Sequence, residues 1–267
     1  RLDDLMISFS VPGGGVGPHI DPYDVFIIQG LGRRRRRVGD ALPLKQHCPH
    51  PALLHVEPFT PIIEVEMEPG DILYIPPGFP HDGYTFEATL NYSVGFRGPN
   101  GRDLISSFAD YALENDLGEK YYTDPDLTCR EHAGKVEDHE LERLRTMMID
   151  MIRQPDDFKQ WFGSFISTPR HELDLAPAEP PYEPEEVATA LEDGETLRRL
   201  NGLRVLSIGG CFFINSERVE TCAPQAMDAL SRFTEVDKTL LGEALQNPAF
   251  VVELTTLINQ GYWFFDE

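Results

Sequence analysis

Residues 15–30 read GVGPHIDPYDVFIIQG, and residues 68–81 read EPGDILYIPPGFPH. In each stretch a Gly- and Pro-rich turn adjoins a short apolar segment, which is the pattern of a β-strand bounded by turns. Each stretch also carries a histidine beside its turn. We expect the strand of the second stretch to end on His81. Together the two stretches predict a domain of short strands with polar side chains held at the strand ends.

The same pattern continues through the first hundred residues. Further short apolar or alternating segments are LMISFSV at 5–11, PIIEVEM at 61–67 and LNYSVGF at 90–96. Many short strands at this spacing are typical of a β-barrel or a β-sandwich. Beyond residue 101 the apolar spacing becomes helical, and helices are predicted over 103–116, 137–153 and 155–167.

The helix predicted over 137–153 has one apolar face. Its members recur at spacings of three and four residues: Leu141, Leu144, Met147, Met148 and Met151. Such a stripe is typical either of the core of a domain or of the seam of a dimer. From the residues alone we favour the core.

A Pro- and Glu-rich stretch, LAPAEPPYEPEE at 175–186, has the composition of a linker that ends at the start of a helix. The remainder predicts helices and a small hairpin, with the helices over 184–193, 223–233, 236–246 and 248–260. This combination suggests a winged-helix-like module. Because residues 184–267 contain no basic cluster and are acidic, we expect the module to contact protein and do not expect it to contact nucleic acid.

Composition narrows the class of protein. With 41% hydrophobic residues and a net charge of −22, the chain is globular and strongly acidic. An acidic field repels nucleic acid and membranes and attracts basic partners, although plain solubility explains it equally well. No apolar run approaches the roughly 18 residues of a membrane helix. The four scattered cysteines suit a reducing cytoplasm.

A metal site is the strongest chemical signal in the sequence. His19 and Asp21 are two residues apart, so in an extended segment their side chains lie on one face. With His81 they make two histidines and one carboxylate, the facial triad of non-haem iron(II) oxygenases. Three protein ligands leave three positions on the metal, two for a bidentate 2-oxo acid and one for dioxygen.

Five consecutive arginines, Arg33 to Arg37, resemble a nucleic-acid patch or a localisation signal. They are expected to continue the strand YDVFIIQG, however, and alternation then turns Arg34 and Arg36 toward one face. An inward guanidinium could bind the distal carboxylate of 2-oxoglutarate through two hydrogen bonds. Geometry does not choose between these two arginines. On the opening strand Ser8 and Ser10 share a face, and either serine could supply a further hydrogen bond, although a purely structural hydroxyl is the simpler interpretation.

Several long blocks are similar to those of the bacterial JmjC-type ribosomal oxygenases. They include GGGVGPHIDPYDVFIIQGLGRRRRRVG, KQHCPHP, EPGDILYIPPGFPHDGY, NYSVGFRGPN and FKQWFGSFI. The resemblance spans essentially the whole chain. It implies a mixed α+β protein: a double-stranded β-helix (cupin, JmjC) catalytic domain over 1–100, a helical dimerisation region over 101–172, a linker over 173–183 and a winged-helix-like domain over 184–267. Members of the family carry a further N-terminal part of the catalytic domain, so we expect the chain to be short at that end.

The resemblance also implies an activity. It is the hydroxylation of an arginine β-carbon (C-3) in a basic ribosomal protein, the sixteenth of the large subunit, by a cytoplasmic homodimer that uses Fe(II), 2-oxoglutarate and dioxygen. Matched position by position, His19, Asp21 and His81 correspond to the iron ligands of the family. Arg34 corresponds to the arginine that binds the 2-oxoglutarate tail, and Ser10 to a serine that assists it. Arg36 is a departure, because an aromatic residue is expected there in some relatives.

Other functions remain open at this point. The same fold carries other protein hydroxylases and demethylases. A non-catalytic cupin could regulate through its winged helix, in which case salt-dependent DNA binding would reveal it. A structural zinc cupin would have the ligands without the oxygen chemistry.

Overall fold

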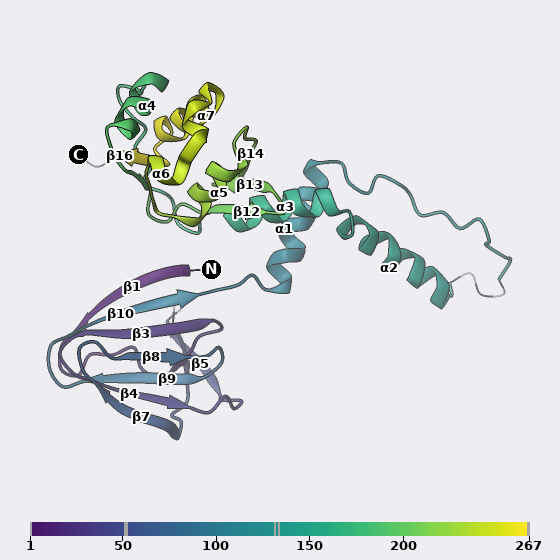
Figure 1. The fold of residues 1–267 in the computed structure, drawn as a ribbon. Helices are drawn as coiled ribbons and strands as arrows, with labels where there is room; N and C mark the ends of the chain where they lie inside the picture. Colours follow the sequence, from purple (N-terminus) through teal and green to yellow (C-terminus); the bar gives the residue numbers. More distant parts are fainter. Residues whose placement is uncertain (1, 51–52, 131, 133, 266–267) are drawn as a thin grey trace. The chain divides into compact units, whose positions relative to one another are not determined.

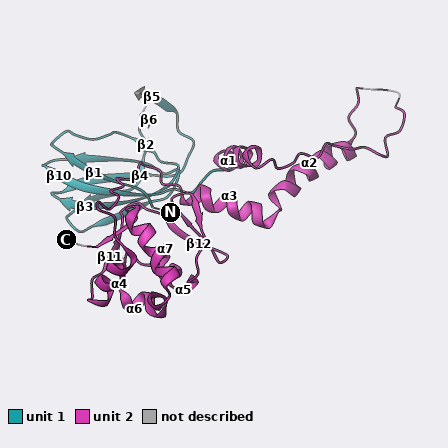
Figure 2. Ribbon diagram, turned by 90° about the horizontal axis from the view of Figure 1, so that it is seen from above, with its two compact units in different colours: residues 1–101 teal, residues 102–267 magenta. Residues whose placement is uncertain are grey.

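The computed structural model describes residues 2–50, 53–130, 132 and 134–265. The chain divides into two compact units, residues 1–101 and 102–267 (Figures 1 and 2). Among the described residues, no helix is both long enough and apolar enough to cross a membrane.

The first unit consists of two antiparallel sheets. The first sheet has the strand order β1-β10-β3-β8, and the second has the order β5-β6-β2-β9-β4-β7. The strands are β1 (Leu2–Ser10), β2 (His19–Ile20), β3 (Asp24–Leu31), β4 (Arg34–Gly39), β5 (Gln46–His50), β6 (Leu53–Val56), β7 (Pro61–Met67), β8 (Ile72–Ile75), β9 (Pro80–Thr85) and β10 (Thr89–Phe96). Non-consecutive neighbours in both sheets give the double-stranded β-helix that the family resemblance implied.

Apolar side chains of the two sheets meet inside the unit. Val25 and Ile27 of β3 and Ile75 of β8 form one buried cluster with Val38 of β4. Alternation along β3 explains the inward set, because Val25, Ile27 and Gln29 are buried and the residues between them are only half-buried. This core fixes the spacing of the two sheets.

Two strand predictions were wrong in the same way. The segment ending at His81 is two strands, because β8 ends at Ile75 and His81 lies in β9 of the other sheet. Pro76 and Pro77 have no N–H to donate to a sheet, and Gly78 turns the chain at a φ of 84°. The bend lets the Gly78 N–H donate to the carbonyl of Asp21 at 2.9 Å.

The arginine run does not continue β3 either. Gly32 adopts a φ of 65°, and the chain then enters β4 in the second sheet. Within β4 the predicted alternation is present, because Arg34 and Arg36 are buried and Arg35 is exposed.

The second unit begins with α1 (Gly101–Glu114), α2 (Asp138–Ile152) and α3 (Pro155–Ser167). Phe108 and Ala112 of α1 pack with Trp161 of α3 in a small buried cluster. A reciprocal capping box between Glu137 and Glu140 starts α2, and Pro155 starts α3 at a position where a proline costs no hydrogen bond.

The core interpretation of the α2 stripe was wrong. No residue of α2 is buried, and Leu144 and Met148 are 45% and 71% exposed. The reason is that only Met151, at the C-terminal end of the stripe, packs against the cluster of Phe108, Ala112 and Trp161, so most of the face has no facing element in the described chain.

The rest of the second unit combines four short helices with two three-stranded sheets. The helices are α4 (Pro184–Glu192), α5 (Pro224–Arg232), α6 (Lys238–Leu241) and α7 (Pro248–Asn259), with a 3₁₀ turn at Gly242–Gln246. The sheets have the orders β12-β13-β14 and β15-β11-β16. Their strands are β11 (Leu197–Arg199), β12 (Val205–Ile208), β13 (Cys211–Ile214), β14 (Glu217–Val219), β15 (Glu235–Val236) and β16 (Trp263–Phe265). The helix predicted over 236–246 is interrupted because Gly242 adopts a φ of 56°.

A large apolar core lies between these elements. Its fully buried members include Met227 of α5, Phe250 and Leu254 of α7, and Trp263 of β16. Helix α3 contacts β12, β13 and β14. An ideal Cβ on Gly163 of α3 would lie 2.3 Å from the ring of Phe213, so the absence of a side chain allows the helix to approach the sheet closely.

Candidate active site

His19, Asp21 and His81 come together between the two sheets of the first unit. Strands β2 and β9 pair so that His19 lies directly opposite His81. The Nε2 atoms of His19 and His81 are 3.9 Å and 3.5 Å from Asp21 Oδ2. Each residue offers one possible ligand atom, a ring nitrogen or a carboxylate oxygen, and these three atoms lie within 4.8 Å of one another. Among the residues that the structure describes, this is the one group of His, Cys and carboxylate side chains with such spacing.

Backbone contacts orient both imidazoles. His19 Nδ1 is 2.8 Å from the carbonyl oxygen of Gly17, and His81 Nδ1 is 3.1 Å from that of Phe79. A carbonyl only accepts, so each Nδ1 carries the hydrogen and donates it. Each Nε2 therefore keeps its lone pair and points toward Asp21, which is the arrangement that a metal ligand needs.

Burial shapes the electrostatics of this group. It lowers the pKa of His81 to about 4, with the neighbouring His19 acting in the same direction. Burial also raises the pKa of the Asp21 carboxyl, although His19 opposes that shift. A divalent cation would reverse the cost of keeping this carboxylate charged. The donor set, two neutral imidazoles and one carboxylate on one side of a point, fits a metal with open positions.

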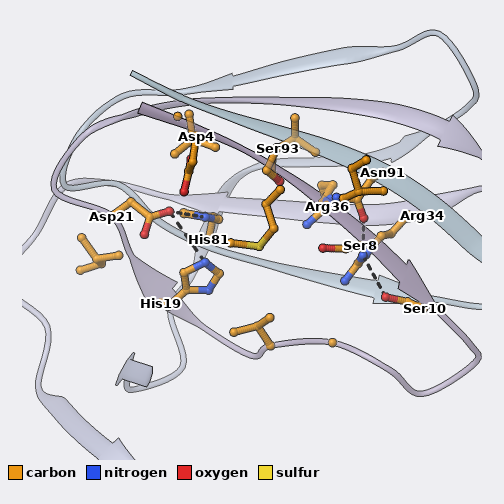
Figure 3. Close-up of a pocket in the computed structure, with 18 of the residues that line it drawn as sticks. Asp4, Ser8, Ser10, His19, Asp21, Arg34, Arg36, His81, Asn91 and Ser93 are labelled. Atoms are coloured by element: carbon orange, nitrogen blue, oxygen red, sulfur yellow. Dashed lines mark hydrogen bonds and ion pairs between the residues drawn. The ribbon is translucent and has the colours of Figure 1, made fainter. Parts of the chain in front are cut away.

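The triad opens into a cavity of about 760 Å³ between the two sheets. Figure 3 shows Asp4, Asp21 and the two histidines at one end of this cavity, and Arg34, Ser10 and Asn91 at the other. The cavity thus has a metal-binding end and a cationic end.

Arg34 forms the cationic end. It is 4% exposed, and its Nη1 donates to Asn91 Oδ1 at 2.7 Å and to Ser10 Oγ at 3.4 Å. Burial lowers the pKa of its guanidinium. Its Nε is buried without a hydrogen-bond partner. An orphaned donor on a buried cation indicates that an anionic group from outside the chain belongs here.

The sequence prediction brought together residues that the structure also places in one cavity: His19, Asp21, His81, Arg34 and Ser10. It missed Asn91, the stronger partner of Arg34. The signal was present, since Asn91, Ser93 and Gly95 alternate along β10 as the small or polar members of an apolar strand.

The opposite face of the same strands carries an ion pair. Asp82, next to His81, is 2% exposed and accepts two hydrogen bonds from the Arg37 guanidinium, one of them from Arg37 Nε at 2.9 Å. The Arg37 guanidinium also lies 5.3 Å from the centroid of the Tyr84 ring. Sequence reasoning gave Asp82 no role.

A double-stranded β-helix that carries two histidines and an aspartate with metal-ligand spacing is the arrangement of a metal-dependent cupin-fold oxygenase domain, the class that includes JmjC domains. Comparison with known proteins agrees, because a JmjC domain family matches residues 1–104 and a ROXA-like winged-helix family matches residues 150–264. The ribosomal protein uL16 3-hydroxylase of Escherichia coli (strain K12) is 59% identical over 266 residues, which cover 100% of this chain and 71% of that protein. The chain belongs to the JmjC-type ribosomal oxygenases.

Solved structures extend this similarity to three dimensions. The X-ray structure of E. coli YcfD has a TM-score of 0.94 at 59% identity, covering 100% of this chain and 72% of that one. A structure of the E. coli ribosomal oxygenase YcfD in complex with cobalt and 2-oxoglutarate has a TM-score of 0.91 at 56% identity, with coverages of 100% and 71%. A probable ribosomal oxygenase of Haemophilus influenzae is 32% identical over 218 residues, covering 77% of this chain and 53% of that protein.

Proposed function

We propose that the protein is an Fe(II)- and 2-oxoglutarate-dependent hydroxylase of an arginine C-3 position in the large-subunit ribosomal protein uL16. One observation carries the proposal: the metal-binding triad and the buried Arg34 lie at opposite ends of a single cavity. A five-carbon dicarboxylate can chelate a metal at one end and present a carboxylate to a guanidinium at the other. The similarity to the E. coli uL16 3-hydroxylase and to the YcfD complex with cobalt and 2-oxoglutarate supports this activity and this co-substrate.

In this proposal His19, Asp21 and His81 hold the iron, and Arg34 holds the co-substrate tail. Asn91 and Ser10 orient the Arg34 guanidinium, so that its remaining donors face the cavity. When bound, iron and 2-oxoglutarate supply the oxidising chemistry, in which one atom of dioxygen enters a C–H bond and the other enters succinate as carbon dioxide leaves. The role of the protein is to hold the iron and the 2-oxoglutarate in place and to position the target carbon beside them.

The metal end of the cavity has the chemistry to receive a cationic side chain. Asp4 of β1 is half-buried there and raises the pKa of both Asp21 and Tyr23, after the larger effect of burial on each. The smaller Asp4 contribution to these shifts reflects the negative charge of two neighbouring carboxylates. Tyr23 adds an aromatic wall to the same end. A substrate guanidinium would supply the missing positive charge, and the net charge of −22 would attract a basic protein from a distance.

The active form is proposed to be a homodimer in the cytoplasm. The exposed apolar stripe of α2 supports the dimer, because a second copy could cover Leu141, Leu144 and Met148. The four cysteines are all free, which is compatible with a reducing compartment.

Mass spectrometry of a substrate fragment tests the reaction. The iron-loaded protein is incubated with 2-oxoglutarate, oxygen and an arginine-containing fragment of uL16. The expected result is a gain of about one oxygen mass on one arginine, which disappears when 2-oxoglutarate is omitted. Asp21→Asn should abolish the gain, whereas Asp40→Asn, at an exposed position of the same unit, should not. No gain on the fragment would refute the substrate, and release of formaldehyde would indicate a demethylase.

A further inference from the structure

Arg36 is a buried cation without a counter-ion. It is 7% exposed, and its Nε has no hydrogen-bond partner. Among the described residues, no carboxylate forms an ion pair with its guanidinium. Asp82, whose charge opposes the fall in the pKa of Arg36, is already paired with Arg37. An unpaired buried charge is strongly destabilising, so a buried arginine without a carboxylate indicates that an anion from outside the chain pairs with it.

Its place in the strand points to the missing partner. In β4, Arg34 pairs with Thr85, Arg36 pairs with Gly83, and Val38 pairs with His81. Arg36 therefore lies between the residue proposed to hold the co-substrate tail and a residue proposed to hold the metal. Both arginines line the same cavity, and Figure 3 shows them side by side at its cationic end.

Gly83 makes room for both guanidiniums. An ideal Cβ at this position would lie 2.7 Å from Arg36 Nη1 and 2.9 Å from Arg34 Nε. The two cations thus lie over one glycine. Their closeness is unfavourable without an anion: burial, and after it the charge of Arg34, lowers the pKa of Arg36 to about 9. At neutral pH both groups are still charged.

We propose that Arg36 is a second binding residue for the dicarboxylate co-substrate, and that the guanidiniums of Arg34 and Arg36 together bind its distal carboxylate. The inference rests on the proposed function, and it adds a residue to the site. Two guanidiniums would favour a charged carboxylate strongly over a neutral amide of the same shape, because only the charged group neutralises the buried cations.

Binding without turnover tests this role. 2-Oxoglutarate is titrated by calorimetry, without oxygen, into the protein loaded with Mn(II). Arg36→Gln should raise the dissociation constant about tenfold to hundredfold, the range expected for losing a hydrogen bond to a charged group. Arg35→Gln is the matched control, since Arg35 lies on the opposite face of the same strand, exposed and paired with Glu64. It should bind like the wild type.

Thermal unfolding without ligand separates binding from a structural role. Removing an unpaired buried cation should leave the unfolding temperature of Arg36→Gln unchanged or raise it, while the increase on adding 2-oxoglutarate shrinks. A lower unfolding temperature with unchanged affinity would overturn the inference. Gly83→Ala offers a second approach, because its methyl group would displace both guanidiniums and should also weaken binding.

The failure of this inference is distinguishable from the failure of the proposed function. If Arg34→Gln loses affinity while Arg36→Gln binds like Arg35→Gln, Arg36 has no role in binding and the proposed function stands. If the wild-type protein with Mn(II) binds no 2-oxoglutarate, the proposed function itself is wrong.

Discussion

His19 and His81 are direct cross-strand partners, and the centroids of their rings lie 4.2 Å apart. The two imidazoles reach this distance because β2 and β9 are adjacent in the second sheet, although they are far apart in the sequence. The site therefore depends on one pairing register as well as on the identity of its residues.

Replacing either histidine should remove the metal. For His19→Ala or His81→Ala we expect loss of bound Fe(II), measured by elemental analysis, and loss of the rise in unfolding temperature that the metal gives the wild type. Saturation at 100 times the dissociation constant corresponds to about 2.7 kcal/mol. His139→Ala, at an exposed position of α2, is the control. Full metal binding by either variant would contradict the ligand assignment.

The Asp82–Arg37 pair should matter for stability. Asp82→Ala leaves the Arg37 guanidinium without its carboxylate, but Arg37 is 28% exposed in its side chain and can be partly rehydrated. We therefore expect a loss of about 1–3 kcal/mol in the free energy of unfolding, measured with urea. Asp40→Ala, at an exposed position, should change it by less than about 0.5 kcal/mol. Equal losses in the two variants would show that the pair contributes little.

The metal-free protein should lose stability on mild acidification. The pKa of His81 is about 4 in the folded chain against an ordinary value of 6.5, so the unfolded state binds the proton more tightly. The contribution of His81 is complete above pH 6.5 and is lost as the pH falls toward 4, by about 3 kcal/mol in all. Unfolding curves of wild type and His81→Asn across this range would test it. Parallel pH profiles for the two proteins would refute the prediction.

Gly163→Ala should destabilise the second unit even though alanine favours helices. The added methyl would collide with the Phe213 ring, which is fully buried and cannot move aside. Overpacking of this kind costs about 1–3 kcal/mol. A double variant with Phe213→Leu should recover part of the loss, and a urea double-mutant cycle measures the coupling. Additive effects would mean that the two residues do not collide.

A charge in the α2 stripe should dissociate the proposed dimer. Met148 is 71% exposed in the single chain, so Met148→Glu should leave the folding of the monomer unaffected while burying a charge in the interface. Analytical ultracentrifugation would then show monomers, whereas Thr146→Glu, away from the stripe, would remain dimeric. A monomeric wild type would refute the dimer.

The sequence predicted the residues of the site better than the course of the chain between the strands that carry them. The spacing of two placed His19 beside Asp21, and alternation placed Arg34 and Arg36 on one buried face. Neither signal contains information on where a chain crosses between sheets. Those crossings depend on bends at Gly32 and Gly78, which both adopt a positive φ. The bent conformations are stabilised only when the chain pairs with strands that are distant in the sequence. Asn91 was missed for a related reason, since its partner Arg34 comes from a different sheet.

For the apolar stripe of α2, the sequence could not predict which element covers it. An apolar helical face predicts that something covers it, but the same pattern serves a neighbouring helix or a second molecule. Only the packing of the whole chain distinguishes the two, and the described chain leaves Leu144 and Met148 uncovered.

Strands β4 and β9 should not tolerate insertions or deletions, because their two faces carry different side chains. His81, Arg34 and Arg36 face the cavity, while Asp82 and Arg37 face away from it. Inserting or deleting one codon inside β9 would turn Asp82 toward the cavity in place of His81, and the same change inside β4 would turn Arg37 toward it in place of Arg36. Changes of length should therefore be confined to connections such as the loop at residues 40–45, outside the two strands.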